Sequence, residues 1–326
     1  MNEVPIDPLG TSTPTPAPAP MPRDPINRRF GIVLGTILGL VLQIGGYLLI
    51  RGEQRSFGNA MFIAVPFVSG FAVAAVVRLP DRFMACLAVA SLLTLSILLF
   101  TGWEGVVCCA MAFPICLAAT LIGATLGYLV RGRVIDRLGA PQKTTLFLVL
   151  LSPLFIAAVD RFEQPYRSTQ QREDFTSEVF VAASPQRVWE VLGQMEHLDG
   201  PRPFLLRIGL PVPTHCTLDH QAVGGRRVCY FENGTIEQEV TEWHPGSLMK
   251  LRIAQNTLPG RHWLTFLDAS YELIPEDTGT RLVRHTSIGT RLYPRWYWRP
   301  LERWGVNSEH EFVLANVQRR AQAAHE

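Results

Sequence analysis

The sequence predicts a protein in two parts. The first is an all-α transmembrane bundle, and the second is an α+β domain in which a curved antiparallel sheet of six or seven strands wraps a long C-terminal helix. Three observations lead to this fold class: apolar runs fill residues 30–160, polar and apolar residues alternate after 176, and an amphipathic stretch ends the chain. Only 18% of the 326 residues are charged, below the usual value of about a quarter.

The composition changes once along the chain, because charged residues become frequent only after Asp160. We therefore expect a disordered, proline-rich cytoplasmic tail at 1–29, a transmembrane region of about five helices at 30–160, a linker at 161–175 and the sheet-and-helix domain at 176–326. In the tail, proline at alternate positions removes backbone donors and cannot build a core. The net charge of +2 gives no single-sign field for a nucleic acid partner.

Five apolar runs form the predicted membrane region. They lie at about 30–50, 59–77, 83–100, 106–130 and 144–159. A helix needs about 20 apolar residues to cross a bilayer, so the first four runs qualify, while the fifth is short and contains Pro153. No carboxylate or histidine lies in the middle of a run, which argues against a transport pathway.

Basic residues near the ends of the runs predict the orientation, because cytoplasmic loops carry the excess of Lys and Arg. With five spans, one side receives nine of them, namely Arg23, Arg28, Arg29, Arg78, Arg82, Arg131, Arg133, Arg137 and Lys143. The other side receives four, namely Arg51, Arg55, Arg161 and Arg167. We therefore expect a multi-pass protein of the plasma (inner) membrane with an extracytoplasmic C-terminal domain. If the fifth run does not cross, that domain is cytoplasmic instead.

Small residues in the first run allow another helix to approach closely, because Gly31, Gly35 and Gly39 recur at four-residue spacing. The fourth run has Gly123 and Gly127 at the same spacing. The first set is either the contact of a homo-oligomer or, as we favour, a packing surface inside this bundle.

The second part is typical of an antiparallel meander. Ser184 and Pro185 have the residue types of an N-cap and a first helical position after an opening strand. Strand-like segments then lie at about 203–210, 216–223, 226–233, 235–243, 247–254, 262–274 and 280–288. Asn233-Gly234, between two alternating runs, is among the strongest hairpin signals. A tight hairpin through Gly224-Gly225 would pair Cys229 with His220, so a disulfide between Cys216 and Cys229 is not favoured.

The final stretch is helical, with Val306, His310, Val313 and Val317 on one face at three- and four-residue spacing. A twisted sheet of this size curls, and a helix with one apolar face must bury it. Placing the helix in the concave face of the sheet satisfies both requirements. Because one helix does not fill such a sheet, we expect an apolar cavity between them.

Four segments carry a resemblance to a known family. They read ASPQRVWEVL (183–192), GGRRVCYFENGTIEQEVTEWHPGSLMKLRI (224–253), YELIPEDTGTRLVRHTSI (271–288) and SEHEFVLANVQRRA (308–321). Residues 176–322 resemble the SRPBCC superfamily of START/Bet v 1-like, helix-grip proteins, and within it the polyketide cyclase/dehydrase and lipid-transport group. The resemblance implies a hydrophobic ligand pocket between sheet and helix, and none of its motifs is catalytic.

Several residues are candidates for ligand binding in this cavity. Tyr230 and Glu232 alternate with Cys229 and Phe231, and the sequence does not fix which pair faces inward, since a shift of one residue exchanges them. In the next strand we expect Gln238 to face the cavity between two apolar neighbours. Val313 and Val317 belong to the inward face of the last helix.

Three ring residues have two interpretations each. His310 either reaches the polar end of a ligand as an acid or base, or is a core histidine bonded to backbone or to a carboxylate such as Glu309, which we favour. His285 either lies near the mouth or is a surface or structural residue. Trp298 lies in an aromatic and basic segment at 293–304 that either touches lipid headgroups or packs on the sheet edge before the helix.

The sequence favours binding over catalysis. It has no HExxH motif and no pair of CxxC motifs, so we expect no metal ion, and it has no GxSxG motif, P-loop or dinucleotide fingerprint. The leading hypothesis is a membrane-anchored protein that binds a lipid or another apolar small molecule, without a cofactor. The alternatives are a cyclase- or dehydrase-like enzyme and a non-catalytic regulatory membrane protein.

Overall fold

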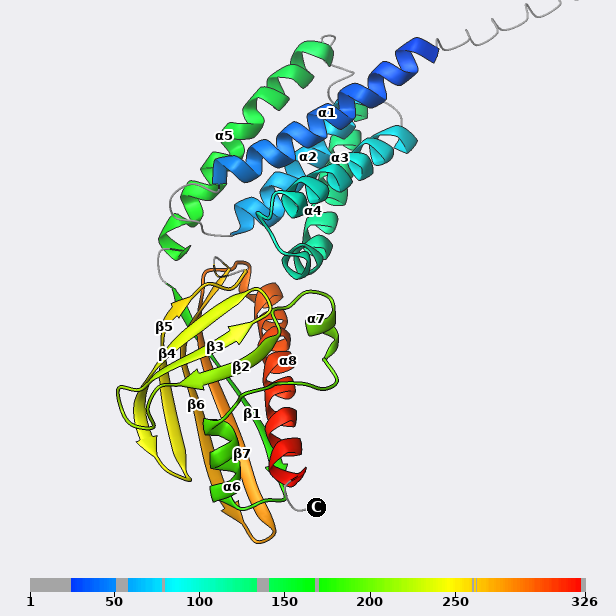
Figure 1. Ribbon diagram of the computed structural model, residues 1–326. Helices are drawn as coiled ribbons and strands as arrows, with labels where there is room; N and C mark the ends of the chain where they lie inside the picture. The colour runs from blue at the N-terminus through cyan, green and yellow to red at the C-terminus, as the bar shows by residue number, and fades with distance from the viewer. Residues whose placement is uncertain are drawn as a thin grey trace, which may run out of the picture.

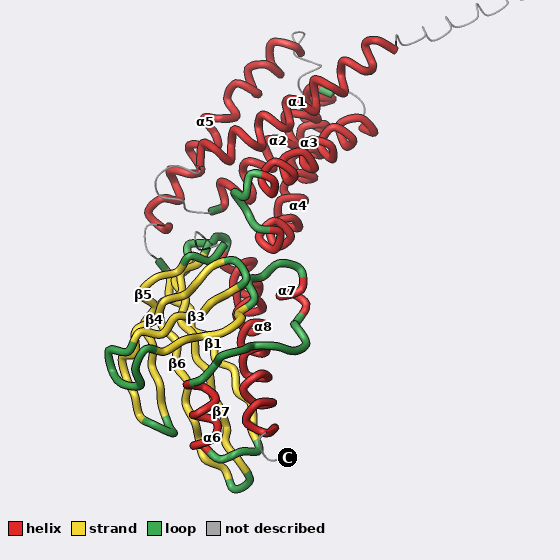
Figure 2. Tube along the Cα trace, in the orientation of Figure 1, coloured by secondary structure: helices red, strands yellow, loops and turns green. Residues whose placement is uncertain are grey.

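The computed structural model describes residues 25–50, 58–77, 80–133, 141–167, 170–259, 261 and 263–323. The first 24 residues lie outside this range, and with them most of the predicted tail. Helices gather at one end of the molecule, and a curled sheet with one long helix forms the other end (Figures 1 and 2). The predicted fold class, an apolar helical bundle followed by a sheet wrapped on its last helix, is confirmed.

The helices of the first part follow the apolar runs of the sequence. They are α1 (Pro25–Ile50), the π-helical turn η1 (Ala60–Ala64), α2 (Val65–Val76), α3 (Pro80–Phe100), α4 (Val106–Arg133) and α5 (Pro141–Arg167). Among the described residues, three helical segments are long and apolar enough to cross a membrane, namely Gly31–Ile50, Arg82–Phe100 and Val106–Arg133. The apolar stretch Ala60–Val76 is shorter. The number of crossings and the orientation of the chain stay predictions.

Glycines bring two pairs of helices into close contact. Gly123 and Gly127 of α4 lie directly against the backbone carbonyls of Phe67 and Phe71 in α2. In α1, Gly35 lies against side chains of α3 and of the end of α2, and Gly39 lies against Ala90 and Val73. Gly35 and Gly39 are therefore in contact with other helices of the same bundle. A Cβ at Gly31, in contrast, would meet nothing within 4 Å.

The second part is built on an antiparallel sheet of seven strands, counted over the described residues, in the order β1-β7-β6-β5-β4-β3-β2. The strands are β1 (Gln171–Val181), β2 (Pro213–Leu218), β3 (Arg226–Phe231), β4 (Gly234–His244), β5 (Leu248–Asn256), β6 (Leu264–Glu276) and β7 (Gly279–Thr290). Helix α6 (Pro185–Gly193) follows β1, and the side chain of Ser184 accepts a hydrogen bond from the backbone of Arg187 as the predicted N-cap.

Two boundaries differ from the prediction. The segment expected as a strand at 203–210 contains the single helical turn α7 (Phe204–Arg207), because its apolar side chains pack onto the C-terminal helix instead of a neighbouring strand. The segment expected as a linker at 161–175 is occupied by the end of α5 and the start of β1.

Helix α8 (Arg295–Gln322) runs along the inner side of the sheet with its C-terminal end pointing away from the helical part (Figure 1). Its second half contributes Val313, Leu314, Val317 and Ala321 to the main apolar core, which also contains Val188 and Leu192 of α6 together with strand residues. The sheet is therefore filled at the end where α6 and the last turns of α8 meet it.

An aromatic cluster joins the two parts. The ring of Trp298 lies 4.6 Å from that of Phe62 and 5.1 Å from that of Trp263, measured between centroids. The indole of Trp263 donates a hydrogen bond of 2.7 Å to the Glu104 carboxylate, and the Tyr297 hydroxyl donates to the backbone carbonyl of Met111. Trp298 is thus a residue of the interface between the two parts.

Replacing Gly123 with leucine should destabilise the helical part, because the new side chain would overlap the backbone of α2. Overpacking of this kind costs on the order of 1–3 kcal/mol. The matched control is Gly132→Ala, since a Cβ there would meet nothing within 4 Å. Thermal unfolding of the full chain in detergent measures both variants. Equal melting temperatures for Gly123→Leu and wild type would contradict the packing described.

Candidate functional site

A cavity of about 180 Å³ lies between the inner face of the sheet and the first half of α8. Its walls are largely apolar. Strands β2–β7 supply one side, α8 the other, and the loop after α7 closes part of the rim. The remaining side is formed by the start of α4, where Gly105, Val107, Cys108 and Met111 face the cavity. The cavity therefore lies at the end of the sheet nearest the helical part.

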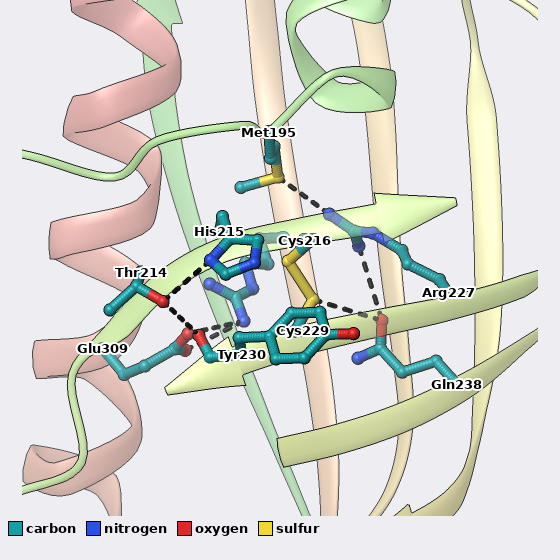
Figure 3. Close-up of a disulfide and its surroundings, with 10 residues drawn as sticks. Met195, Thr214, His215, Cys216, Arg227, Cys229, Tyr230, Gln238 and Glu309 are labelled. Atoms are coloured by element: carbon teal, nitrogen blue, oxygen red, sulfur yellow. Dashed lines mark hydrogen bonds and ion pairs between the residues drawn. A yellow bond between two sulfur atoms is a disulfide. The ribbon is translucent and has the colours of Figure 1, made fainter. Parts of the chain in front are cut away.

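A disulfide between Cys216 and Cys229 crosses from β2 to β3 in the cavity wall (Figure 3). The pairing that the sequence did not favour is the one present, because the connection is not a tight turn at Gly224-Gly225. The side chain of Asp219 accepts hydrogen bonds from the backbone N–H groups of His220 and Arg226, which closes a wider loop. This loop sets Cys216 directly opposite Cys229.

The disulfide also fixes which side chains face inward. Cys229 and Phe231 line the cavity, so Tyr230 and Glu232 lie on the opposite face, away from it. Tyr230 stacks on His215 with centroids 4.4 Å apart (Figure 3), and Glu232 forms a 2.8 Å ion pair with Arg202. The structure therefore does not bring these two predicted residues to the site.

The other predicted residues divide between the cavity and its surroundings. Gln238, Trp298 and Val313 line the cavity. Val317 is buried in the apolar core behind it. His285 lies on the outer side of β7, where its ring forms a 3.0 Å hydrogen bond with the Thr176 hydroxyl.

His310 is fully buried beside the cavity but faces strands β1 and β7. Its Nε2 lies 2.8 Å from the Thr286 hydroxyl, and its Nδ1 lies 3.0 Å from the Ser177 hydroxyl. Burial, and secondarily the charges of Arg284 and His285, lower the pKa of His310 to about 2. His310 is therefore a neutral core histidine bonded to two hydroxyl groups, rather than to Glu309 or to backbone.

The strongest polar feature of the cavity is a buried ion pair. Arg284 of β7 donates from Nη2 to both carboxylate oxygens of Glu309 in α8, at 3.1 and 2.9 Å. Burial by itself lowers the pKa of Arg284, but Glu309 and the neighbouring Tyr271 raise it, and the net pKa lies above its usual value. Arg284 is therefore charged inside an apolar cavity.

Two nitrogen atoms of this arginine have no acceptor among the described residues. Arg284 is 9% exposed. Its Nε and Nη1 atoms are buried and have no hydrogen-bond partner in the described part of the chain. A buried, unpaired donor costs about 1–3 kcal/mol, and more when it is charged. Because both atoms have almost no accessible surface, a ligand acceptor would reach them only if the guanidinium shifted toward the cavity.

A second buried arginine lies on the same aromatic ring. The guanidinium carbons of Arg227 and Arg284 lie 5.5 and 5.3 Å from the centroid of the Tyr271 ring. Arg227 also donates to the Met195 sulfur and, at 3.5 Å, to the carbonyl oxygen of Gln238 (Figure 3). These contacts fix the position of the Arg227 guanidinium beside the disulfide.

Sequence reasoning did not select Arg284, Arg227 or Tyr271. The signal is present in β7, where inward positions alternate as Leu282, Arg284 and Thr286, with the charged residue between two that are buried. A charge at an inward position of an alternating strand is expensive unless it is paired, so such a position indicates a special role.

Comparison with protein-family models gives one match, to the family described as polyketide cyclase/dehydrase and lipid transport, over residues 172–322. The match begins in β1 and ends with α8. The C-terminal half of the chain is an SRPBCC domain. None of the curated proteins compared with the chain matches it.

Solved structures similar to the SRPBCC domain cover a little under half of the chain. The Zhui aromatase/cyclase from a Streptomyces species is 17% identical and covers 48% of this chain and 97% of its own, with a TM-score of 0.33. A START superfamily protein from Mycobacterium smegmatis is 12% identical and covers 46% and 98%, with a TM-score of 0.34. A norcoclaurine synthase mutant from Thalictrum flavum is 12% identical and covers 48% and 99%, with a TM-score of 0.34.

The pKa of His310 predicts how the stability of the SRPBCC domain depends on pH. The folded pKa of about 2 lies below the ordinary value of 6.5, so the unfolded state binds the extra proton between these two values. Stability is then full above pH 6.5 and falls as the pH drops, by about 1.4 kcal/mol per pH unit. His310→Asn should be less stable at pH 7 but should lose less stability between pH 6 and pH 4.

Tryptophan fluorescence during thermal unfolding of the full chain measures this dependence. The control is His244→Gln, because the His244 side chain is 61% exposed and its variant should keep the wild-type slope. If the slope of His310→Asn equals that of wild type, His310 is not the titrating group.

Proposed function

We propose that this protein is a membrane-anchored binding protein for a hydrophobic small molecule. The observation that carries the proposal is the apolar cavity between the sheet and α8, whose fourth side is the start of the apolar helix α4. The family description, which includes lipid transport, supports it. Anchoring would keep the cavity near molecules dissolved in the bilayer and would raise their effective concentration.

The ligand we infer is an amphiphile, with an apolar body and an oxygen-bearing polar end. The lining supplies apolar surface over most of its area, while Arg284 has two nitrogen donors without a protein acceptor among the described residues, which a shift of the guanidinium would bring to a ligand. Carboxylate or phosphate oxygens would make charge-assisted hydrogen bonds with these donors, about twice as strong as neutral ones. A molecule of pure hydrocarbon would leave the donors unpaired.

Binding is better supported than a cyclase- or dehydrase-like reaction. Of the ionisable residues that the sequence predicts for the cavity, Glu232 and Tyr230 lie outside it, and His310 is bonded to two hydroxyl groups. Among the ionisable side chains that do line the cavity, Arg284 and Glu309 form an ion pair with each other, and Glu302 forms one with Arg295.

Filling the cavity should abolish binding. Ala269 lines the cavity from β6, so Ala269→Trp places an indole inside it, whereas Glu272→Trp adds the same group on the exposed face of that strand. We expect the full chain in detergent to retain palmitate in native mass spectrometry, Glu272→Trp to retain as much, and Ala269→Trp to retain roughly tenfold less.

Equal retention by Ala269→Trp and wild type, with both proteins monodisperse, would show that palmitate does not bind in this cavity. The molecules that co-purify with wild type test the role of Arg284 separately. We expect species with a carboxylate or phosphate group, and hydrocarbons alone would contradict that role.

We also propose that the SRPBCC domain lies outside the cytoplasm. The excess of basic residues on the opposite side supports this orientation, and so does the Cys216–Cys229 disulfide, because disulfides persist mainly in oxidising compartments.

A variant that keeps only these two cysteines tests the orientation in intact cells. A membrane-impermeant maleimide should modify it only after addition of a membrane-impermeant reductant, because the thiols are then released outside the membrane. Protection of the thiols in intact cells even with the reductant, together with modification after the cells are permeabilised, would place the domain in the cytoplasm. Modification of intact cells without the reductant would show that the two cysteines are not paired.

A further inference from the structure

The helical part contains a second cavity, larger than the first, with a volume of about 430 Å³. It lies between α1, α3 and α4 with η1 at its floor, and we call it the bundle groove. Its lining comes from α1, η1, the start of α2, α3 and α4, together with Glu104 and Trp263.

The groove exists because α3 and α4 have different partners. Helix α4 packs on α2 through Gly123 and Gly127, while α3 packs mainly on α1, near Gly35 and Gly39. The two helices make little contact with each other, so their facing sides remain apart.

The rim of the bundle groove is apolar and open to the surroundings of the bundle. Leu92 is 64% exposed, and Met84, Phe113 and Leu117 are each more than two-fifths exposed. These residues belong to two helices of membrane-spanning length and hydropathy. In a bilayer, such a rim faces hydrocarbon rather than water.

The few polar groups inside the groove are bonded to one another. The Gln43 amide donates to the Ser91 hydroxyl at 3.2 Å and accepts from the Thr94 hydroxyl at 2.8 Å. The groove therefore offers an apolar surface with satisfied polar groups, which suits a hydrocarbon chain.

The bundle groove and the cavity of the SRPBCC domain meet at two side chains. Cys108 and Trp263 line both of them. Trp263 is held in place by Glu104, which also accepts a 2.9 Å hydrogen bond from Tyr47 of α1. Cys108 and Trp263 therefore lie between the two spaces at the place where these approach each other.

We propose that the bundle groove binds the acyl chain of a bilayer amphiphile and passes it to the SRPBCC cavity between Cys108 and Trp263. The ligand then enters sideways from the membrane, without crossing water. This inference rests on the proposed function, since it supplies the route by which that cavity is filled. It adds a second binding site, in the helical part, for the same class of ligand.

A photoactivatable palmitate with a diazirine on its chain tests the route. The full chain is placed in nanodiscs, the probe is supplied either in the bilayer or on albumin in the aqueous phase, and the labelled peptides are identified by mass spectrometry. We expect wild type to be labelled on α3 and α4 and on the strands that line the cavity, with the groove labelled first.

Three variants separate the steps. Ala88→Trp fills the bundle groove, and its matched control is Val89→Trp, the next residue of α3, which is exposed and does not line the groove. With the probe in the bilayer, Ala88→Trp should slow labelling of the cavity roughly tenfold, and Val89→Trp should not change it. Cys108→Phe should keep the groove label and lose most of the cavity label.

The outcomes distinguish this inference from the proposed function. Cavity labelling of Ala88→Trp and Cys108→Phe at the wild-type rate from the bilayer would overturn the route but leave the cavity as a binding site. Labelling of the wild-type protein in the cavity but not in the bundle groove would also overturn the route and leave the cavity as a binding site. No cavity label in wild type from either source would overturn the proposed function as well.

Discussion

The burial of α8 against the concave side of the sheet is the constraint on which the rest of the structure depends. The helix can cover only part of an inner face formed by seven strands. At one end the space is filled, because α6 adds Val188 and Leu192 to the apolar core around Val317. At the other end, strands, α8 and the start of α4 surround the remaining space without filling it.

The same geometry explains why charged groups are buried there. A buried ion pair recovers its desolvation cost only when its geometry is good and its remaining polar atoms are satisfied. Arg284 meets the first condition through Glu309 and not the second, since Nε and Nη1 have no acceptor in the described part of the chain. Such an arrangement therefore contributes little to the stability of the fold by itself.

The contact between the two parts depends on a small number of large side chains. Phe62, Trp263 and Trp298 pack together, and Glu104 joins Trp263 to Tyr47 of α1. These residues come from five segments that are distant in sequence. One of them, Trp263, lines both the cavity and the bundle groove, so the contact between the two parts lies beside both spaces.

The sequence by itself determined the order of elements and the fold class. Apolar runs of membrane length, the Asn233-Gly234 turn, the cap at Ser184 and the amphipathic last helix are local signals, and each depends only on neighbouring residues. It also determined that Gln238 and Val313 point toward the interior of the domain. The reason is that side chains alternate between the two faces of a strand and repeat every 3.6 residues around a helix.

Only the tertiary structure decided the register and the pairing of distant groups. The wider loop at Asp219 set the partner of Cys229, and with it the outward direction of Tyr230 and Glu232. The pair of Arg284 with Glu309 and the approach of Trp263 to Cys108 join segments that no local pattern relates. The physical reason is that a turn sets strand register through its full hydrogen bonding, and long-range contacts depend on how whole elements pack.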